Sequence, residues 1–420
     1  MLTRLASERR RAHPGLVFGL LLFGLEAVQG IGLPLLFKYA LGVETAAAWV
    51  LLTSSTTLLA LACAAQGQAV VRNFSVLQTG RIAQLPANWF ALRRTLRMLN
   101  GAILLIAQVV FLWVGDGLLA KLGAQGAWAV VIFMLGQHVR GLAFGNFMAL
   151  NGARRVGQDK ALLLLSSGVQ LLLIAVLLSL GQGLLPLAMV SLAAQLLLWI
   201  GSERQLAALP LGPSNARLGG WKEGGGLFLL GLAGYFSVNT DLLLSAALLS
   251  PQAQIEYAIA ARCLYVPVAL VGLWAQLRFP FWSASELSLR HSLHEVLRLG
   301  ACMTGLTIAL ALMLFGWATR SGEQSSALSL PTWMLSLMIV NSSLAAMTSG
   351  VGQVLLAKRW LGFLAASIPL ALLAPWLAFC MARLLEPEAF VLGYSLSSCT
   401  VLWALAVCVR RGLTRPYPGN

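Results

Sequence analysis

Apolar runs of roughly twenty residues follow one another along this chain, and each is long enough to cross a hydrocarbon core about 30 Å thick. Backbone polar groups find no water in that core, so each run is predicted to be a helix. The strands of a membrane barrel would be shorter and would alternate in polarity. We therefore predict an all-α polytopic membrane protein with about twelve transmembrane helices.

The predicted spans fall into two sets of six, separated by a loop that contains Pro210, Gly212 and Pro213. The first set comprises residues 14–37, 46–71, 98–120, 127–150, 161–181 and 184–201, and the second 224–249, 257–281, 299–319, 330–356, 360–384 and 389–409. The sequence thus predicts an N-terminal six-helix bundle over residues 1–201, a cytoplasmic linker over 202–223 and a C-terminal six-helix bundle over 224–420.

Both predicted bundles follow their second span with a longer basic, amphipathic loop, residues 72–97 and 282–298. Within the second loop, residues 283–298 have the pattern of a helix lying on the membrane surface. Six spans per half place both repeats in the same orientation, so we predict parallel, pseudo-symmetric repeats. Two such bundles around a central cleft would have the geometry of alternating access.

Positive charge is distributed very unevenly between the two sides of the predicted topology. The net charge is +15, and 23 of the 29 Lys and Arg residues lie on the side of the termini, against four on the other. Cytoplasmic loops carry such an excess, so both termini are predicted to be cytoplasmic. The charge is therefore interpreted as an orientation signal, and no nucleic-acid partner is expected.

The chain offers little that would support catalysis. No phosphate-binding loop of the nucleotide-binding kind is present, and His291, His294 and Glu295 fall short of a metalloprotease motif. The six cysteines lie within apolar segments without metal-site spacing, and no disulfide is expected. With 10% charged residues, the chain has no segment long enough for a separate soluble domain. We predict a protein that is not an enzyme, with no cofactor, metal site or catalytic residue.

Three stretches resemble the polysaccharide flippases of the multidrug/oligosaccharidyl-lipid/polysaccharide exporter superfamily. The first is Leu33-Pro34-Leu35-Leu36 with Leu41-Gly42 and Trp49; the second is Gly67-Gln68 with Val71-Arg72. The third and most specific runs from Asp241-Leu242-Leu243-Leu244 through Leu248-Leu249-Ser250 to Tyr257-Ala258-Ile259-Ala260-Ala261-Arg262. The resemblance implies a MATE-like, V-shaped fold in a bacterial inner membrane.

The same resemblance implies a function. Flippases of this branch move undecaprenyl-pyrophosphate-linked oligosaccharide across the inner membrane for surface polysaccharide such as O-antigen lipopolysaccharide, and a polymerase and a chain-length regulator are expected partners. Two departures favour this branch over its neighbours: lipid II flippases usually have fourteen spans, and small-drug antiporters are expected to carry an aspartate signature in the first span. This chain has Glu26 and Gln29 there instead.

Asp241 and Arg262 are predicted to lie at similar depth on adjacent helices of one hairpin. A charge at the centre of a span costs roughly 2.5–3.5 kcal/mol on insertion scales, so each needs a partner or a wet cavity. One interpretation is a salt bridge that holds the two helices together. The other is a gate or a proton-sensitive switch, with Arg262 also a candidate substrate ligand.

Three further ionisable residues lie inside predicted spans. Arg140 is the preferred candidate for binding a pyrophosphate, because its guanidinium is a permanent cation with several donors. His138 is two residues away and faces nearly the opposite direction, so it is either a packed histidine or a protonation site. Glu26 could carry a coupling proton or neutralise Arg140, and Gln29 is expected on the same face.

Arg72 and Arg278 end the second spans of the two halves. They could receive the lipid pyrophosphate at the cytoplasmic mouth, or they could simply obey the orientation rule. Serine, threonine and asparagine side chains inside spans, such as Asn341 and Ser342, could bind sugar hydroxyls or their own helices.

Three functions remain open at this point. The first is the flippase. The second is a cation-coupled multidrug antiporter of the same fold, which would need an acidic cavity. The third is an integral-membrane polysaccharide polymerase or glycosyltransferase, which would usually need a larger loop outside the membrane than this chain has.

Overall fold

The structure is a computed structural model of the chain. It describes residues 2–53, 70–71, 73–74, 84–114, 116–216, 240–284, 289–320, 330–357 and 364–414. Within these ranges the architecture is all-α, and eight helices have the length and apolar composition to cross a membrane. Parts of the second and seventh predicted spans fall outside the ranges, so the number of twelve spans stays a prediction. The chain divides into two compact units, unit 1 (Met1–Gly231) and unit 2 (Leu232–Asn420).

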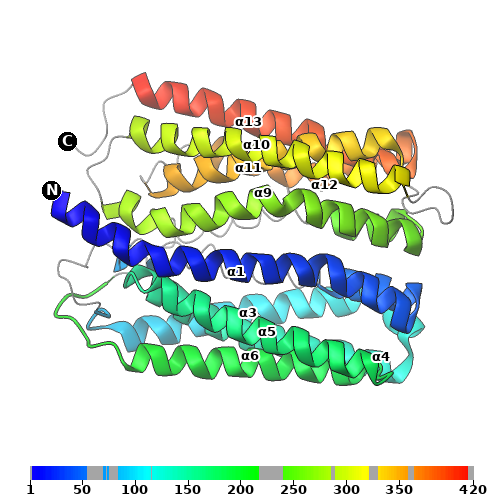
Figure 1. The fold of residues 1–420 in the computed structure, drawn as a ribbon, viewed down its shortest axis with the longest axis horizontal. Helices are drawn as coiled ribbons and strands as arrows, with labels where there is room; N and C mark the ends of the chain where they lie inside the picture. Colours follow the sequence, from blue (N-terminus) through cyan, green and yellow to red (C-terminus); the bar gives the residue numbers. More distant parts are fainter. Residues whose placement is uncertain are drawn as a thin grey trace. The chain divides into compact units, whose positions relative to one another are not determined.

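Unit 1 is a bundle of long helices that run alongside one another (Figure 1). Its labelled helices are α1 (Leu2–Leu41), α3 (Trp89–Val114), α4 (Asp116–Gly152), α5 (Val156–Ser179) and α6 (Leu184–Ala207), with a further short helix over Val43–Thr53. Helix α4 packs most extensively against α6, and α5 lies between α1 and α6. The buried core at one end of this unit gathers around Phe74, Trp89, Phe147 and Leu150.

Unit 2 repeats this construction with α8 (Thr240–Leu248), α9 (Pro251–Ala284), α10 (Leu289–Arg320), α11 (Thr332–Ala357), α12 (Leu364–Leu384), the short η2 (Pro387–Ala389) and α13 (Phe390–Thr414). Helices α12 and α13 form the tightest pair, and α11 contacts α9, α10 and α13. Small residues permit this close packing, as expected where helices associate in lipid. A Cβ atom added to Gly393 of α13 would collide with the backbone of Ala378 in α12.

The turn after α1 follows the Leu41-Gly42 pair of the sequence. Gly42 is the one residue between α1 and the next helix, and its φ of +91° is a left-handed conformation that glycine adopts without strain. The amide of Ala46 donates to the carbonyl of Gly42 at 3.1 Å, so the next helix begins at once. Glycine at this position is the usual helix terminator.

Two predicted boundaries are wrong. The third span was expected over residues 98–120, but α3 ends at Val114 and residues 116–126 belong to α4. The second is the separate surface helix expected over residues 283–298. Helix α9 extends to Ala284, and residues 289–298 are the beginning of the continuous helix α10. Its apolar positions Leu293 and Val296 are buried inside unit 2, so they pack on protein instead of the bilayer surface.

The segment between the predicted bundles is docked on unit 1. Residues 202–207 belong to α6, and Leu211 forms a parallel β-bridge with Leu85, in the segment that precedes α3. The side-chain amide of Asn88 donates to the carbonyl of Ala216 at 2.7 Å and accepts from its amide at 3.0 Å. Residues 202–216 of the predicted linker therefore pack with unit 1, while the limits 1–201 and 224–420 stay predictions.

Candidate functional site

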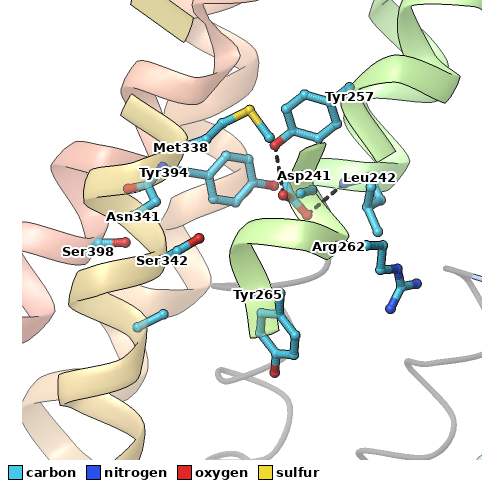
Figure 2. Close-up of a pocket in the computed structure, with 12 residues that line it drawn as sticks. Asp241, Leu242, Tyr257, Arg262, Tyr265, Met338, Asn341, Ser342, Tyr394 and Ser398 are labelled. Atoms are coloured by element: carbon cyan, nitrogen blue, oxygen red, sulfur yellow. Dashed lines mark hydrogen bonds between the residues drawn. The ribbon is translucent and has the colours of Figure 1, made fainter. Parts of the chain in front are cut away.

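Unit 2 contains a small cavity of about 70 Å³, lined by both polar and apolar side chains. Four helices line it: α8 and α9 contribute Asp241, Tyr257, Arg262 and Tyr265, and α11 and α13 contribute Asn341, Ser342, Tyr394 and Ser398, among others (Figure 2). Positions 257, 261 and 265 fall on one face of α9 because they follow the helical repeat, and Arg262 comes next to that face. The sequence motif that runs from Asp241 to Arg262 thus forms one wall of this cavity.

The carboxylate of Asp241 is the acidic group of the cavity, and Tyr257 holds it. The phenolic hydroxyl of Tyr257 donates to Oδ2 of Asp241 at 2.8 Å, and the amide of Leu242 donates to Oδ1 at 2.7 Å. Tyr257 is only 2% exposed, so this hydrogen bond is shielded from competing solvent. Hydrogen bonds to an ionised carboxylate are stronger than those between neutral groups.

An aromatic cluster fixes the tyrosines around Asp241. The ring of Tyr257 packs edge-on against buried Phe390 at 5.2 Å, and Phe390 contacts the ring of Tyr394 at 6.5 Å. The hydroxyl of Tyr394 is hydrogen bonded to Thr240, the residue before Asp241. This bond joins α8 to α13, so the position of the carboxylate is tied to three helices.

Arg262 shares the cavity with Asp241 but does not form the salt bridge that one interpretation of the sequence predicted. The hydrogen bonds of Asp241 go to Tyr257 and Leu242, and Figure 2 shows the guanidinium of Arg262 pointing away from the carboxylate. Within the described part of unit 2, no ion pair joins the two residues. A tyrosine therefore occupies the place next to Asp241 that the sequence assigned to the arginine.

Glu26 and Gln29 of α1 do not share a common role. Gln29 donates its side-chain amide to the carbonyl of Ser167 in α5 at 2.9 Å, whereas Glu26 is exposed. Among the described residues no ion pair links Glu26 with Arg140, so the predicted neutralisation is not observed. Whether Glu26 carries a proton stays a prediction.

The two-residue spacing of His138 and Arg140 directs them to different sides of α4. The ring of His138 lies against Gly101 of α3, which agrees with a packed histidine. Arg140 is half-buried in unit 1 and is not among the residues that line the unit 2 cavity. Its assignment to substrate binding therefore stays a prediction.

Arg278 lies near the end of α9 and contacts other residues of unit 2. Its guanidinium pairs with Glu295 of α10 at 2.9 Å and lies over the ring of Trp274, 5.8 Å from the centroid. Trp282 adds a long contact of 3.5 Å to the same carboxylate. These contacts fit a structural role. Arg72, its predicted counterpart, lies outside the described residues.

Two residues next to Asp241 were missed as site residues. Tyr257 was noticed only as part of a motif, although Tyr257, Ala261 and Tyr265 follow one another at four-residue spacing and so lie on one face of a helix. Tyr394 carries no local signal, because its partner Thr240 is 154 positions away in the chain. Such a pairing emerges only when the helices are packed together.

Comparison with known proteins shows what this architecture is similar to. No family model matches the sequence, and no curated protein matches it. Among solved structures, the MATE multidrug transporter DinF-BH is 14% identical with a TM-score of 0.66, over 96% of this chain and 95% of that one.

Two further structures agree. A point mutant of the Vibrio cholerae MATE transporter VcmN has a TM-score of 0.66 at 14% identity, covering 97% of this chain and 98% of its own. The eukaryotic MATE transporter AtDTX14 has a TM-score of 0.65 at 12% identity, covering 98% and 97%. At these identities the likeness concerns architecture along the whole chain. This protein therefore has the fold of the MATE transporters.

Proposed function

We propose that this chain is a membrane transporter that couples the movement of an organic substrate to that of a cation, with Asp241 as the coupling carboxylate. The observation that carries the proposal is the Asp241 carboxylate, held by Tyr257 at a small cavity within a helix bundle. Ionisable groups at membrane depth are costly and mark ion or proton pathways. The MATE fold, found in transporters named for multidrug transport, supports the same assignment.

The size of the cavity indicates which part of the cycle it serves. A volume of about 70 Å³ has room for a few water molecules or a small ion. Pockets for drug-sized molecules are larger, on the order of 300–1,000 Å³. The cavity is therefore assigned to the coupling ion and not to the organic substrate.

The hydrogen bonds suggest how binding at Asp241 would act on the helices. An ionised carboxylate accepts the Tyr257 hydroxyl, whereas a protonated or cation-bound carboxylate has less capacity to accept it. Losing that bond would loosen the contact between α8 and α9, while Thr240 and Tyr394 still join α8 to α13. A change of charge at one residue would thus favour a different arrangement of three helices.

A second candidate is the transport of undecaprenyl-pyrophosphate-linked oligosaccharide. Arg262 lines the same cavity together with Asn341, Ser342 and Ser398, which are side chains suited to a phosphate and to hydroxyl groups, although about 70 Å³ has room for only a small part of such a substrate. The short motifs that begin at Leu33, Gly67 and Asp241 support this candidate, because they resemble those of the polysaccharide flippases. A polymerase and a chain-length regulator would then be its partners.

Transport by the purified protein in vesicles separates the two candidates. One set of vesicles receives a fluorescent organic cation, and the other a labelled polyprenyl-pyrophosphate oligosaccharide. The first candidate predicts movement of the organic cation that depends on an imposed cation gradient. Movement of only the lipid-linked sugar would replace it with the second, and movement of neither would reject both.

The predicted location adds a separate test. We place both termini in the cytoplasm of a bacterial inner membrane because of the basic residues on that side. Reporter fusions at the N-terminus and C-terminus should both show cytoplasmic activity. A periplasmic signal from either terminus would contradict this topology.

A further inference from the structure

One end of unit 1 carries a carboxylate that binds two arginines at once. Glu203 of α6 accepts hydrogen bonds from the guanidinium groups of Arg93 and Arg97, both on α3. Asn146 of α4 and Trp199 of α6 also donate to Oε1 of Glu203, at 2.9 and 3.0 Å. The carboxylate thus accepts four hydrogen bonds and holds the two guanidiniums in fixed positions. The two arginines and Glu203 together carry one net positive charge.

The arginines keep donors available outside this cluster. The Arg97 side chain is 33% exposed and that of Arg93 is 20% exposed. A guanidinium has five N–H donors, and the contact with Glu203 uses only part of them. Arg94, the next residue, is exposed and makes no hydrogen bond or ion pair within the described ranges. The exposed side of α3 therefore presents positioned cationic donors.

Large apolar side chains flank these arginines on the same side of the helix. Phe90 is 66% exposed and Met98 is 68% exposed. Positions 90, 94, 97 and 98 follow the helical repeat and share one face, while Trp89, Leu92 and Leu96 turn into the core. Two basic groups thus lie between two apolar groups along the first turns of α3, before the apolar remainder of this helix.

We propose that this face of α3 binds the headgroup of an anionic phospholipid. Met98 would contact the acyl chains, and Arg94 and Arg97 would bind the phosphate. Phe90 would lie at the membrane–water interface, where aromatic side chains gather. A guanidinium suits phosphate because it offers parallel donors and a permanent charge. The orientation rule explains the presence of basic residues here. It does not explain the exposed apolar groups, or the carboxylate of Glu203 that holds Arg93 and Arg97 while Asn146 and Trp199 donate to it.

The test uses the purified full chain in a neutral detergent with equal amounts of phosphatidylglycerol and phosphatidylethanolamine. Native mass spectrometry then counts the lipids that each protein molecule retains. We expect wild type to prefer phosphatidylglycerol. The affinity of the double variant Arg94→Gln, Arg97→Gln for this lipid should fall by roughly thirtyfold, the scale for two arginines at an anionic surface. Arg94→Gln alone breaks no described contact and should give an intermediate loss.

The matched control changes the same amount of charge elsewhere. Arg290 and Arg298 are exposed on α10 of unit 2, so Arg290→Gln, Arg298→Gln removes two positive charges without touching α3. This control should retain phosphatidylglycerol as wild type does. Equal losses of phosphatidylglycerol in both double variants would show that total charge alone attracts the lipid. Unchanged retention in the α3 variant would show that this face does not bind it. Either result overturns the proposal.

A second pair of substitutions tests the apolar part of the surface. Phe90→Ser, Met98→Ser keeps every arginine but removes the groups assigned to the interface and the acyl chains. Phosphatidylglycerol retention should fall severalfold. If retention stays at the wild-type level, the face does not bind a lipid as proposed.

Discussion

The hydroxyl of Tyr257 donates a hydrogen bond to Oδ2 of Asp241 at 2.8 Å, from the next helix along the chain. Both residues belong to one sequence motif, and 16 positions separate them. The bond gives a carboxylate inside the unit 2 bundle a partner without neutralising its charge. A site of this kind can respond to a proton or a cation, whereas a closed salt bridge would respond less readily.

The energetic coupling of Asp241 should therefore be larger with Tyr257 than with Arg262. Double-mutant cycles with Asp241→Asn, Tyr257→Phe and Arg262→Gln measure both couplings from unfolding free energies in detergent micelles. We expect about 1–3 kcal/mol for Asp241 with Tyr257, the range for hydrogen bonds to charged groups, and a smaller value for Arg262. A larger coupling with Arg262 would restore the salt bridge that the sequence suggested.

Glu203 should stabilise unit 1 more than Glu295 stabilises unit 2. Glu203→Gln leaves Arg93 and Arg97 next to each other without their shared carboxylate, whereas Glu295→Gln releases only Arg278. Because Glu203 is partly exposed, we expect a loss of about 1–3 kcal/mol, below that for a fully buried pair. Thermal unfolding of the two variants provides the comparison. Equal melting temperatures of the Glu203→Gln and Glu295→Gln variants would contradict the larger stabilising role assigned to Glu203.

Asn88 should protect the segment after α6 from proteolysis. Its amide both donates to and accepts from the backbone of Ala216, so Asn88→Ala removes two hydrogen bonds at one position. Limited proteolysis should then cut residues 208–216 several times faster than in wild type. Thr95→Ala is the control, because the Thr95 hydroxyl bonds only to its own helix. A cleavage rate that does not change in Asn88→Ala would show that the β-bridge holds the segment without it.

Gly393 should tolerate no larger side chain. In Gly393→Leu the new side chain meets the backbone of α12, which can yield only if α12 and α13 separate. We expect a loss of several kcal/mol or failure to fold, beyond the 1–3 kcal/mol typical of overpacked cores. Gly305→Leu in α10 is the control, since a Cβ there meets nothing within 4 Å. Similar yields and melting temperatures for both variants would disprove the close approach.

The sequence predicts the local parts of this fold well. The span expected over 330–356 corresponds to α11, Thr332–Ala357, and Gly42 ends α1 where the Leu41-Gly42 pair indicates. These features depend on apolar run length and on the conformational freedom of glycine, and both are properties of neighbouring residues. The presence of Asp241 and Arg262 in one cavity also follows from their positions on two consecutive helices, whereas Tyr257 was not predicted as a site residue.

Features that depend on distant contacts could not be predicted in this way. The amphipathic pattern of residues 289–298 is the same whether its apolar face meets the bilayer or protein, and the structure buries Leu293 and Val296 in unit 2. The role of Glu203 depends on residues of α3 more than a hundred positions earlier. Tyr394 depends on Thr240 in the same way. Helical periodicity gives the face of a residue but not its partner.

The most direct test of the central claim is cation-coupled transport in vesicles by wild type, Asp241→Asn and the control Glu386→Gln, an exposed carboxylate of the same unit. Transport of the substrate identified in the vesicle experiment is followed with and without an imposed cation gradient. We predict that the gradient accelerates transport by wild type and Glu386→Gln, and that Asp241→Asn no longer responds to it. A gradient response that is unchanged in Asp241→Asn would contradict the assignment of Asp241 as the coupling residue.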